Sequence, residues 1–405
     1  MAPLKVLICG GGCAGPALAY WLAREGHSIT IVERFTALRA TGAQIDLRAQ
    51  GIQVVKRMGL LDTIRSKRVE ERGWSYVDSQ GRTKATIMSN SSGKGAQTAT
   101  SEYEIMRGDL VRILYDATKE NTKYIFGVTI ESFEQYDDRV VVHFSNGCSD
   151  TFDVLVGADG QGSRIRKAIL PPGAEPFRRL GVYMAYWFVP RTEADSEFSQ
   201  SYHCPGSRMI TSRSHSETET QAYFVLKDDS EELRSIPKAP IQQQKEFWTQ
   251  RFRNTGWQTD RFIEGMRTAE NFYCQEIVQV ITDTWYDNRV VLLGDAGYCP
   301  SPLTGMGTTA SFVGAYVLAG EIIRNPQNLS QAFANYQNIL QPFIKEVQNI
   351  NPWMLRLGLP QTQWGINIFQ SVVGILCYLR VFELIARFSK EEVGGWMLPD
   401  YPELK

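Results

Sequence analysis

The sequence predicts an α/β fold. A short apolar run at residues 4–9 ends in a cluster of glycines, and a helical pattern follows it. A second apolar run at residues 28–32 comes after that pattern, which gives the order strand, helix, strand. Two further apolar runs, at residues 152–157 and 290–293, each end in a turn that contains Gly and Asp. Such strands, alternating with helices, are typical of a parallel sheet covered by helices.

The glycine cluster fits the pattern G-x-G-x-x-G with Gly10, Gly12 and Gly15. The first glycine allows the tight turn, the second lets a pyrophosphate approach the backbone, and the third lets the helix pack closely on the strand. The helix that follows offers free N–H groups and the positive end of its dipole to phosphates. The second apolar run ends at Glu33, close to the offset of an acid that binds a ribose hydroxyl. This context predicts a dinucleotide site.

Length and composition limit the remaining possibilities. The chain has 405 residues, enough for two or three domains, and its 43 basic and 44 acidic residues give a net charge of −1. No long run of one sign occurs, so we expect no nucleic-acid partner. The 7 cysteines include no C-x-x-C pair and the histidines number 4, so we expect no metal site and no disulfide framework. A reduced, cytoplasmic protein without a signal peptide is the expectation.

The next elements follow from local patterns. Residues 51–60 carry apolar side chains at helical spacing, and the pattern at 74–87 predicts a hairpin because a turn-rich segment separates two β-prone runs. The Ser/Gly/Thr-rich stretch 89–100 is expected to be a mobile loop. A helix is expected to begin at Arg107, and β-prone runs follow between residues 124 and 144.

Prolines and a glycine at residues 171–176 mark a domain boundary. A second domain of sheet plus helices is predicted by strand-like runs and helical patterns at residues 179–189, 209–213, 221–227, 246–255 and 260–269. Aromatic residues are frequent in this region. On the face of a sheet they either belong to the core or line a pocket for a flat substrate.

Two helical patterns, at residues 308–323 and 329–349, come before an apolar segment at residues 365–379. The segment contains two amide side chains and is shorter than the roughly 20 apolar residues that a membrane-spanning helix needs. We expect a buried or interface helix and no stable membrane insertion. Contact with a membrane surface is the alternative.

Two further motifs combine glycine with an acid. Gly157-Ala158-Asp159-Gly160 ends one buried strand and is followed by Ser163 and Arg166. Gly294-Asp295-Ala296 ends another buried strand and leads into the loop at residues 302–307. The order and combination of the three motifs are far more specific than a glycine-rich turn alone.

The three motifs resemble those of the class A FAD-dependent monooxygenases, the flavoprotein aromatic hydroxylases. The helix led by Arg107 also matches, and the resemblance covers about residues 4–345. Within the family, Ile45-Asp46-Leu47-Arg48 and the compact length look most like the tetracycline-inactivating hydroxylases and related fungal and bacterial secondary-metabolite enzymes. The resemblance implies a Rossmann-like FAD-binding domain of the aromatic-hydroxylase type, an inserted mixed β-sheet substrate domain and a C-terminal helical segment.

The implied FAD-binding domain is discontinuous and comprises residues 1–72, 101–176 and 274–348. The implied substrate-binding sheet domain comprises residues 73–100 and 177–273, and the C-terminal helices comprise residues 349–405. We expect a monomer or a homodimer.

The resemblance also implies which residues bind FAD, tightly but without a covalent bond. These are Gly10, Gly12, Cys13, Ala14, Gly15, Glu33, Arg34, Arg48, Arg107, Asp159, Asp295, Pro302, Gly305, Met306 and Gly307. Among them, Glu33 would hold the adenosine ribose, Arg34 would lie beside the adenine, and Asp159 would serve both flavin and nicotinamide binding.

The remaining implied roles concern the centre of the cofactor. Arg107 would contact the pyrophosphate or the ribityl chain, and Asp295 would bind the ribityl hydroxyls or the pyrophosphate. The backbone of residues 305–307 would pass under the isoalloxazine, where N–H groups and the following helix dipole stabilise negative charge on the reduced flavin.

The implied reaction is carried by the cofactor. No second G-x-G-x-x-G is present, so NAD(P)H would bind transiently, reduce the flavin and leave. Reduced flavin reacts with O2 at C4a to give a hydroperoxide, which transfers one oxygen atom to an electron-rich carbon. We therefore expect hydroxylation of an aromatic or polycyclic small molecule. Epoxidation and Baeyer–Villiger oxidation on the same scaffold stay open.

Two other classes of function stay in view. A flavin-dependent reductase or dehydrogenase would consume no O2 in turnover, and a halogenase would carry a W-x-W-x-I-P motif, which the sequence lacks. A non-enzymatic binder that had lost the flavin would have no physical need for Gly12, Glu33, Asp159 and Asp295 together.

The expected substrate-contacting residues follow from one departure from the family pattern. Many phenol-hydroxylating fungal relatives carry an arginine that holds a phenolate, and Trp187 stands at the corresponding place here. Arg208, Arg213 and Tyr223 are candidates to replace it, and Tyr186 is a further candidate for a catalytic role. A bulky, less acidic substrate suits the aromatic residues better.

Overall fold

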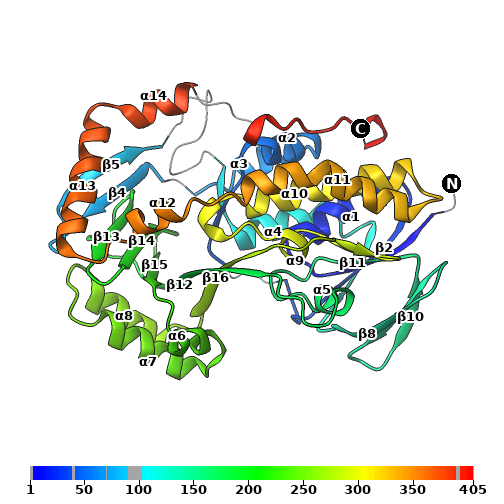
Figure 1. Ribbon diagram of the computed structural model, residues 1–405, viewed down its shortest axis with the longest axis horizontal. Helices are drawn as coiled ribbons and strands as arrows, with labels where there is room; N and C mark the ends of the chain where they lie inside the picture. The colour runs from blue at the N-terminus through cyan, green and yellow to red at the C-terminus, as the bar shows by residue number, and fades with distance from the viewer. Residues whose placement is uncertain (1–2, 39–41, 70, 90–102, 389–392, 405) are drawn as a thin grey trace.

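The computed structural model describes residues 3–38, 42–69, 71–89, 103–388 and 393–404. The loop expected at 89–100 lies outside these residues except for Ser89. Two main sheets lie side by side, with β4, β5 and β13 towards the left of Figure 1 and β2 and β11 towards the right. The predicted α/β fold is confirmed.

The first sheet has the strand order β17-β18-β11-β1-β2-β7. Its strands are β1 (Lys5–Cys9), β2 (Ser28–Glu33), β7 (Thr122–Phe126), β11 (Val154–Gly157), β17 (Tyr286–Asp287) and β18 (Val290–Leu292). Every pairing is parallel except that of β17 with β18. The apolar runs of β1, β11 and β18 are buried because helices cover the sheet, as the sequence predicts.

The register of this sheet brings the three motifs together. Cys9 at the end of β1 pairs with Gly157 of β11, and Gly157 pairs with Leu292 of β18. Each of these residues is followed directly or after one residue by a glycine–acid or glycine-rich turn. In a parallel sheet the carboxyl ends of neighbouring strands share one edge, where ligands bind in open α/β folds.

Helices and short strands surround this sheet. The helices are α1 (Ala14–Arg24), α2 (Ala49–Arg57), α3 (Leu61–Arg65), α4 (Arg107–Asp116), α5 (Arg164–Ile169), α9 (Asp295–Tyr298), α10 (Gly307–Arg324) and α11 (Leu329–Val347). The short strands are β3 (Gln44–Asp46), β6 (Glu104–Met106), β8 (Ile130–Gln135), β9 (Val140–Phe144) and β10 (Ser149–Phe152). β3 pairs with β6, and β8 to β10 form a small antiparallel sheet.

The second main sheet has the order β16-β12-β15-β14-β13-β4-β5. Its strands are β4 (Gly73–Val77), β5 (Thr83–Met88), β12 (Phe177–Pro190), β13 (Ser199–Cys204), β14 (Arg208–Ser214), β15 (Glu219–Lys227) and β16 (Tyr273–Val280). The hairpin predicted at 74–87 is confirmed as β4 and β5, which join the sheet through a parallel pairing of β4 with β13. β16 extends the sheet to Val280, past the boundary expected at residue 273.

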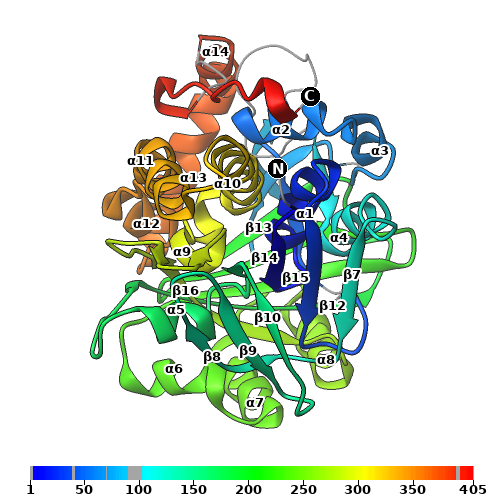
Figure 2. The same cartoon turned by 90° about the vertical axis from the view of Figure 1, so that its right-hand side faces the viewer.

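The two faces of this sheet differ. Helices α6 (Glu231–Ser235), α7 (Ile241–Phe252) and α8 (Thr259–Thr268) lie on one side of it, at the bottom of Figure 2. Trp187, Phe224 and Phe262 form a core with these helices. Alternation along the strands places Tyr186 and Tyr223 on the opposite face.

The C-terminal segment forms α12 (Pro352–Gly358), α13 (Gln363–Tyr378) and α14 (Val381–Phe388), with α13 beside β5. Only Ile366 and Val373 of α13 are buried. Of the two expected forms, a buried or an interface helix, α13 therefore has the second, because the sheet covers only one side of the helix. No helix in the described ranges has both the length and the apolar character needed to cross a bilayer.

Candidate functional site

The glycine-rich turn after β1 is packed so closely that two of its positions admit only glycine. Gly10 has φ +120°, and a Cβ there would lie 2.3 Å from the Ala158 carbonyl oxygen. A Cβ on Gly15 would lie 2.2 Å from the Gly10 carbonyl oxygen. Gly12 is different, since the atom nearest to a Cβ added there would be Arg107 Nη2, at an ordinary contact distance of 3.5 Å. The first and third glycines thus fix the turn, and the second faces the space in front of Arg107.

Glu33 at the end of β2 is held at this turn. Its Oε2 accepts a hydrogen bond of 2.8 Å from the Gly11 N–H, and its Oε1 accepts one of 3.1 Å from the Phe35 N–H. Arg34 is exposed, and its guanidinium lies 4.9 Å from the centre of the Phe35 ring. The carboxylate that the sequence assigns to the adenosine ribose therefore lies against the pyrophosphate turn.

Arg107 connects the first motif to the third. Its side chain passes Gly12 and Gly42, and its charge acts on both Cys13 and Asp295. Burial raises the pKa of Asp295 above its ordinary value, and the Arg107 guanidinium opposes that rise. Burial likewise raises the pKa of the Cys13 thiol, so this cysteine is not a thiolate nucleophile. A cation and a carboxylate thus converge beside the glycine-rich turn.

The loop before α10 completes the site. Ser301 Oγ accepts from the Leu303 N–H at 3.3 Å, and Gly305 adopts a left-handed conformation with φ +64°. Arg48 lies beside this loop, with its Nε 3.6 Å from the place of a Gly305 Cβ, and it forms an ion pair with Asp46. Helix α10 begins at Gly307, so the N–H groups of its first turn have no carbonyl of a preceding turn to bond.

The second motif has a structural function in the same place. Asp159 Oδ2 accepts from the Arg164 N–H at 2.8 Å, and Ser163 caps α5 by accepting from the Arg166 N–H. The buried Arg166 donates to the carbonyl oxygens of Ala296 at 2.9 Å and Gln161 at 2.6 Å. The motif therefore orders the edge of the sheet through α5.

These residues fit a bound FAD. One oxygen of Asp159, Oδ1, is buried and has no hydrogen-bond partner among the described atoms. The turn at Gly12 leaves room in front of Arg107, and the N-termini of α1 and α10 supply unpaired N–H groups. A pyrophosphate needs such a cation and such donors, and a ribityl chain needs a carboxylate such as Asp295 to accept from its hydroxyls.

Three of the predicted substrate residues, Tyr186, Arg213 and Tyr223, lie on the sheet face opposite the helices α7 and α8. The rings of Tyr186 and Tyr223 stack with centroids 5.6 Å apart. Tyr223 donates from its hydroxyl to Gln221 Oε1 at 2.6 Å, and burial raises its pKa above the ordinary value. Gln221 in turn donates to Gln44 Oε1 at 3.2 Å, which links β15 to β3.

Arg213 is enclosed by carboxylates. Its guanidinium donates to Glu71 at 3.0 and 2.6 Å, forms a further ion pair with Glu104, and lies 5.8 Å from the centre of the Trp74 ring. These two acids raise the pKa of Arg213 well above its ordinary value, against the effect of burial. Burial raises the pKa of Glu71, although Arg213 opposes the rise. One guanidinium thus faces two buried carboxyl groups.

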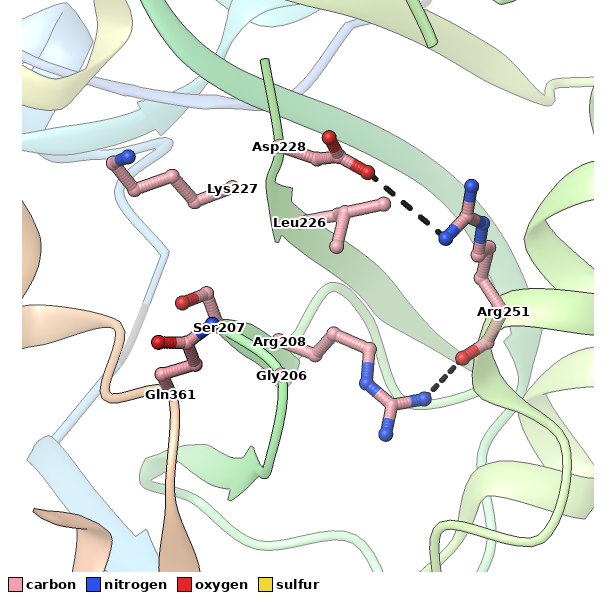
Figure 3. A pocket seen from close by; sticks show the side chains of 8 residues that line it. All are labelled: Gly206, Ser207, Arg208, Leu226, Lys227, Asp228, Arg251 and Gln361. Carbon is pink, nitrogen blue, oxygen red and sulfur yellow. Dashed lines mark hydrogen bonds and ion pairs between the residues drawn. The ribbon is translucent and has the colours of Figure 1, made fainter. Parts of the chain in front are cut away.

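Arg208, the remaining candidate from the sequence, and Trp187, at the place of the relatives' arginine, both point away from this face. The Trp187 indole donates to the Phe262 carbonyl oxygen at 3.0 Å, within the helix-covered core. Arg208 bonds to backbone oxygens of Pro205 and Arg251. It lines a cavity of about 390 Å³ at the β13–β14 turn (Figure 3), which contains none of the expected FAD-binding residues.

Four polar residues at this face were not identified from the sequence, namely Gln44, Glu71, Glu104 and Gln221. Gln44 and Glu104 stand between apolar neighbours in short strands, which is a usable signal, whereas Gln221 follows Thr220 in a buried strand. Glu71 precedes β4 and has no such signal.

Comparison with known proteins agrees with this geometry. The family model "FAD binding domain" matches residues 3–337. The chain is 38% identical to the FAD-dependent monooxygenase asL6 of Sarocladium schorii over 99% of both chains, and 40% identical to the flavin-dependent monooxygenase eupH of a Phoma species over 92% of both. The crystal structure of tetracycline destructase Tet(55) superposes with a TM-score of 0.80 and 29% identity, covering 98% of this chain and 99% of that one.

Proposed function

The chain belongs to the FAD-binding domain family and is an FAD-dependent monooxygenase, and from this premise we propose that it uses NAD(P)H and O2 to hydroxylate a neutral aromatic or polycyclic small molecule. The observation that carries the cofactor assignment is the convergence of Gly12, Arg107 and Asp295 at the shared edge of β1, β11 and β18. No histidine or metal cluster is required at this place for oxygen transfer.

FAD, when bound, supplies electron storage and the transfer of one oxygen atom. The protein supports this chemistry electrostatically. Arg107 would offset the negative charge of the pyrophosphate, and Asp295 would accept hydrogen bonds from the ribityl hydroxyls. The N-terminus of α10, beginning at Gly307, carries the positive end of the helix dipole, which would stabilise negative charge on a reduced flavin held there.

The proposed substrate site is the sheet face that carries Tyr186 and Tyr223. Two stacked aromatic rings form a flat apolar wall against which a planar ring system would pack out of contact with water. The hydrogen bond from Tyr223 to Gln221 fixes the orientation of that surface. Both tyrosines are buried, and Tyr223 is neutral around pH 7, since burial raises its pKa.

The charge balance at this face favours a neutral substrate. Arg213 is already paired with Glu71 and Glu104, so an incoming carboxylate or phenolate would compete with two carboxyl groups. His203 on the same sheet is buried and bonded to the Gly358 carbonyl oxygen, and burial lowers its pKa. A neutral imidazole does not attract an anion.

The test begins with the purified protein in air. Flavin absorbance that bleaches on addition of NADPH or NADH and returns with O2 would support the proposed redox cycle. A panel of planar aromatic compounds, each offered as a neutral methyl ester and as the free carboxylate, is then screened for faster O2 uptake and for products heavier by one oxygen. We expect the neutral member of each pair to be preferred.

Two results would contradict the proposal. Turnover without oxygen in the product would indicate a reductase or dehydrogenase. Consistent preference for the carboxylate members would contradict the neutral-substrate assignment and would require Arg213 to leave one of its two acids.

A further inference from the structure

Exposed apolar side chains are concentrated in the C-terminal helices. Of the 19 large apolar residues that are exposed among the described parts of the chain, 12 lie between residues 353 and 397. Single exposed apolar residues are normal on a protein surface, but a contiguous group marks a site of interaction. Trp353, Met354 and Leu357 belong to α12, and Leu384 and Ile385 belong to α14.

Helix α13 carries apolar residues on two opposite faces. Ile366, Phe369 and Val373 face the sheet. The centroid of the Phe369 ring lies 5.3 Å from that of Tyr76 and 5.0 Å from that of His203. A second set follows at intervals of four or three residues, which places its members on one face of the helix. This outer stripe consists of Trp364 (75% exposed), Ile368 (42%), Val372 (49%), Ile375 (58%) and, at the C-cap, Leu379 (57%).

The packing against the sheet fixes which way the outer stripe points. The α12–α13 loop is tied down by hydrogen bonds from the Gly206 N–H to the Gln361 carbonyl oxygen at 2.8 Å and from the Ser207 N–H to that of Pro360. Gln370 donates to the Val77 carbonyl oxygen at 3.4 Å. The inner face of α13 is thus held on β4, β5 and β13, and the outer stripe is exposed on the opposite side of this helix, which lies at the left edge of Figure 1.

The charge and composition of the C-terminal helices indicate which kind of partner binds the outer stripe. Between Glu346 and Glu383 the sequence contains no acidic residue, and its only charged residues are Arg356 and Arg380, which are exposed. Trp364 and Tyr378 (86% exposed) are the aromatic types that favour the boundary between lipid and water. An apolar, aromatic and cationic surface complements anionic lipid.

We propose that the outer stripe of α13 docks the protein on the surface of an anionic lipid bilayer, with the helix lying in the plane of the interface. A second copy of the chain is a poorer partner, because a two-fold interface would bring this face against itself and pair only arginines. Insertion across the bilayer is not required, and α13 is too short for it. Docking would place the face of the sheet under α13 next to the lipid.

The experiment measures sedimentation of the FAD-loaded protein with vesicles of phosphatidylcholine alone or mixed with phosphatidylserine. We expect binding to the phosphatidylserine vesicles. Ile368→Gln/Ile375→Gln should weaken it about tenfold or more, because two side chains lose burial in lipid. Arg356→Gln should weaken it about fivefold on the anionic vesicles only.

The matched control is Ile241→Gln/Ile281→Gln, which makes the same two changes at side chains that are 59% and 44% exposed elsewhere. Its binding should equal that of the wild type. Trp364→Gln is measured in parallel, and flavin content and circular dichroism check that each variant is folded.

Three outcomes would overturn the proposal. In the first, the wild type fails to bind either kind of vesicle. In the second, the folded outer-stripe variants bind the vesicles as well as the wild type does. In the third, the protein does not bind vesicles and analytical ultracentrifugation finds a dimer that Ile368→Gln/Ile375→Gln dissociates, which would assign the face to a second copy of the chain.

Discussion

Arg166 on α5 donates a hydrogen bond from Nη1 to the carbonyl oxygen of Ala296 at 2.9 Å. The bond joins the motif after β11 to the motif after β18, and a second bond from Nη2 to the Gln161 carbonyl oxygen closes the connection. The guanidinium and its bond to Ala296 are buried, so water is not a substitute partner for that carbonyl, whereas the bond to Gln161 is partly buried. The edge of the sheet at which we expect FAD to bind therefore depends on one arginine that does not itself belong to the expected cofactor contacts.

Arg166→Met should accordingly destabilise the protein and weaken FAD retention. Removal of the guanidinium leaves the buried Ala296 carbonyl oxygen without this donor, which costs about 1–3 kcal/mol of folding free energy. Urea denaturation followed by flavin fluorescence measures the loss. Lys167→Met is the control, since it removes a neighbouring cation that is exposed. Equal stability of the two variants would contradict a connecting role for Arg166.

Gly15→Ala should also disrupt the cofactor site. The new Cβ would lie 2.2 Å from the Gly10 carbonyl oxygen and 3.0 Å from Ile8 Cγ2, both in the packed contact of β1 with α1. Relief of this overlap requires the helix to move away from the strand, at a cost of about 1–3 kcal/mol or more. We expect a protein that purifies with little flavin.

Gly162→Ala is the matched control for this change, because nothing lies within 4 Å of the new Cβ and the glycine has no left-handed φ. It should keep its flavin. If both variants keep the same flavin content, the close packing of the turn is not what orders the site.

The cofactor half of the molecule could be predicted from sequence to a large extent. The motifs at Gly10, Asp159 and Asp295 each follow an apolar run, and their order in the chain implies neighbouring strands. The chemistry of each motif is local, because a turn, a helix start and an acid lie within a few residues of one another. Local sequence is therefore sufficient to identify them.

The substrate half depends on contacts between distant segments. Strand β13 was not predicted, because Ser199–Cys204 has little apolar alternation and gains its place by pairing with both β4 and β14. Arg213 appeared free to bind an anion, since nothing near it in the sequence indicates that Glu71 and Glu104 lie against it. The outer stripe of α13 has the same periodicity as a buried face, and only the structure shows which face is covered.

Glu71→Gln should change how stability depends on pH. Burial raises the pKa of Glu71 in the folded protein above its ordinary value of 4.5. The protonated form is therefore favoured by folding, so the contribution of Glu71 is fully present below pH 4.5 and is lost as the pH rises through the folded-state pKa. The introduced amide would not titrate, and its oxygen would still accept from Arg213.

The melting temperature of Glu71→Gln, minus that of the wild type, is therefore expected to increase as the pH is raised from 4.5 to about 8. Differential scanning fluorimetry across this range measures it. Asp62→Asn, with a side chain 98% exposed, controls for the loss of a surface carboxylate and should show a small, constant offset. A constant offset for Glu71→Gln would show that the buried carboxyl does not couple to folding.

Asp295→Ala should weaken FAD retention most directly. The variant removes the acceptor expected to bind the ribityl hydroxyls. It also removes the carboxyl group with which the Arg107 guanidinium interacts electrostatically. Loss of a hydrogen bond to a charged group corresponds to about 1.5–3 kcal/mol, or roughly 10- to 100-fold in Kd.

Arg107→Met should weaken FAD retention as well. The double variant should lose less FAD-binding free energy than the sum of the two single losses, because the two groups interact. The ratio of visible flavin absorbance to protein absorbance, with titration of apoprotein by FAD, measures each loss. Asp283→Ala, at an exposed acid before β17, controls for removal of a carboxylate and should stay fully yellow. If Asp295→Ala is as yellow as this control, Asp295 does not hold the cofactor and its burial beside Arg107 has another cause.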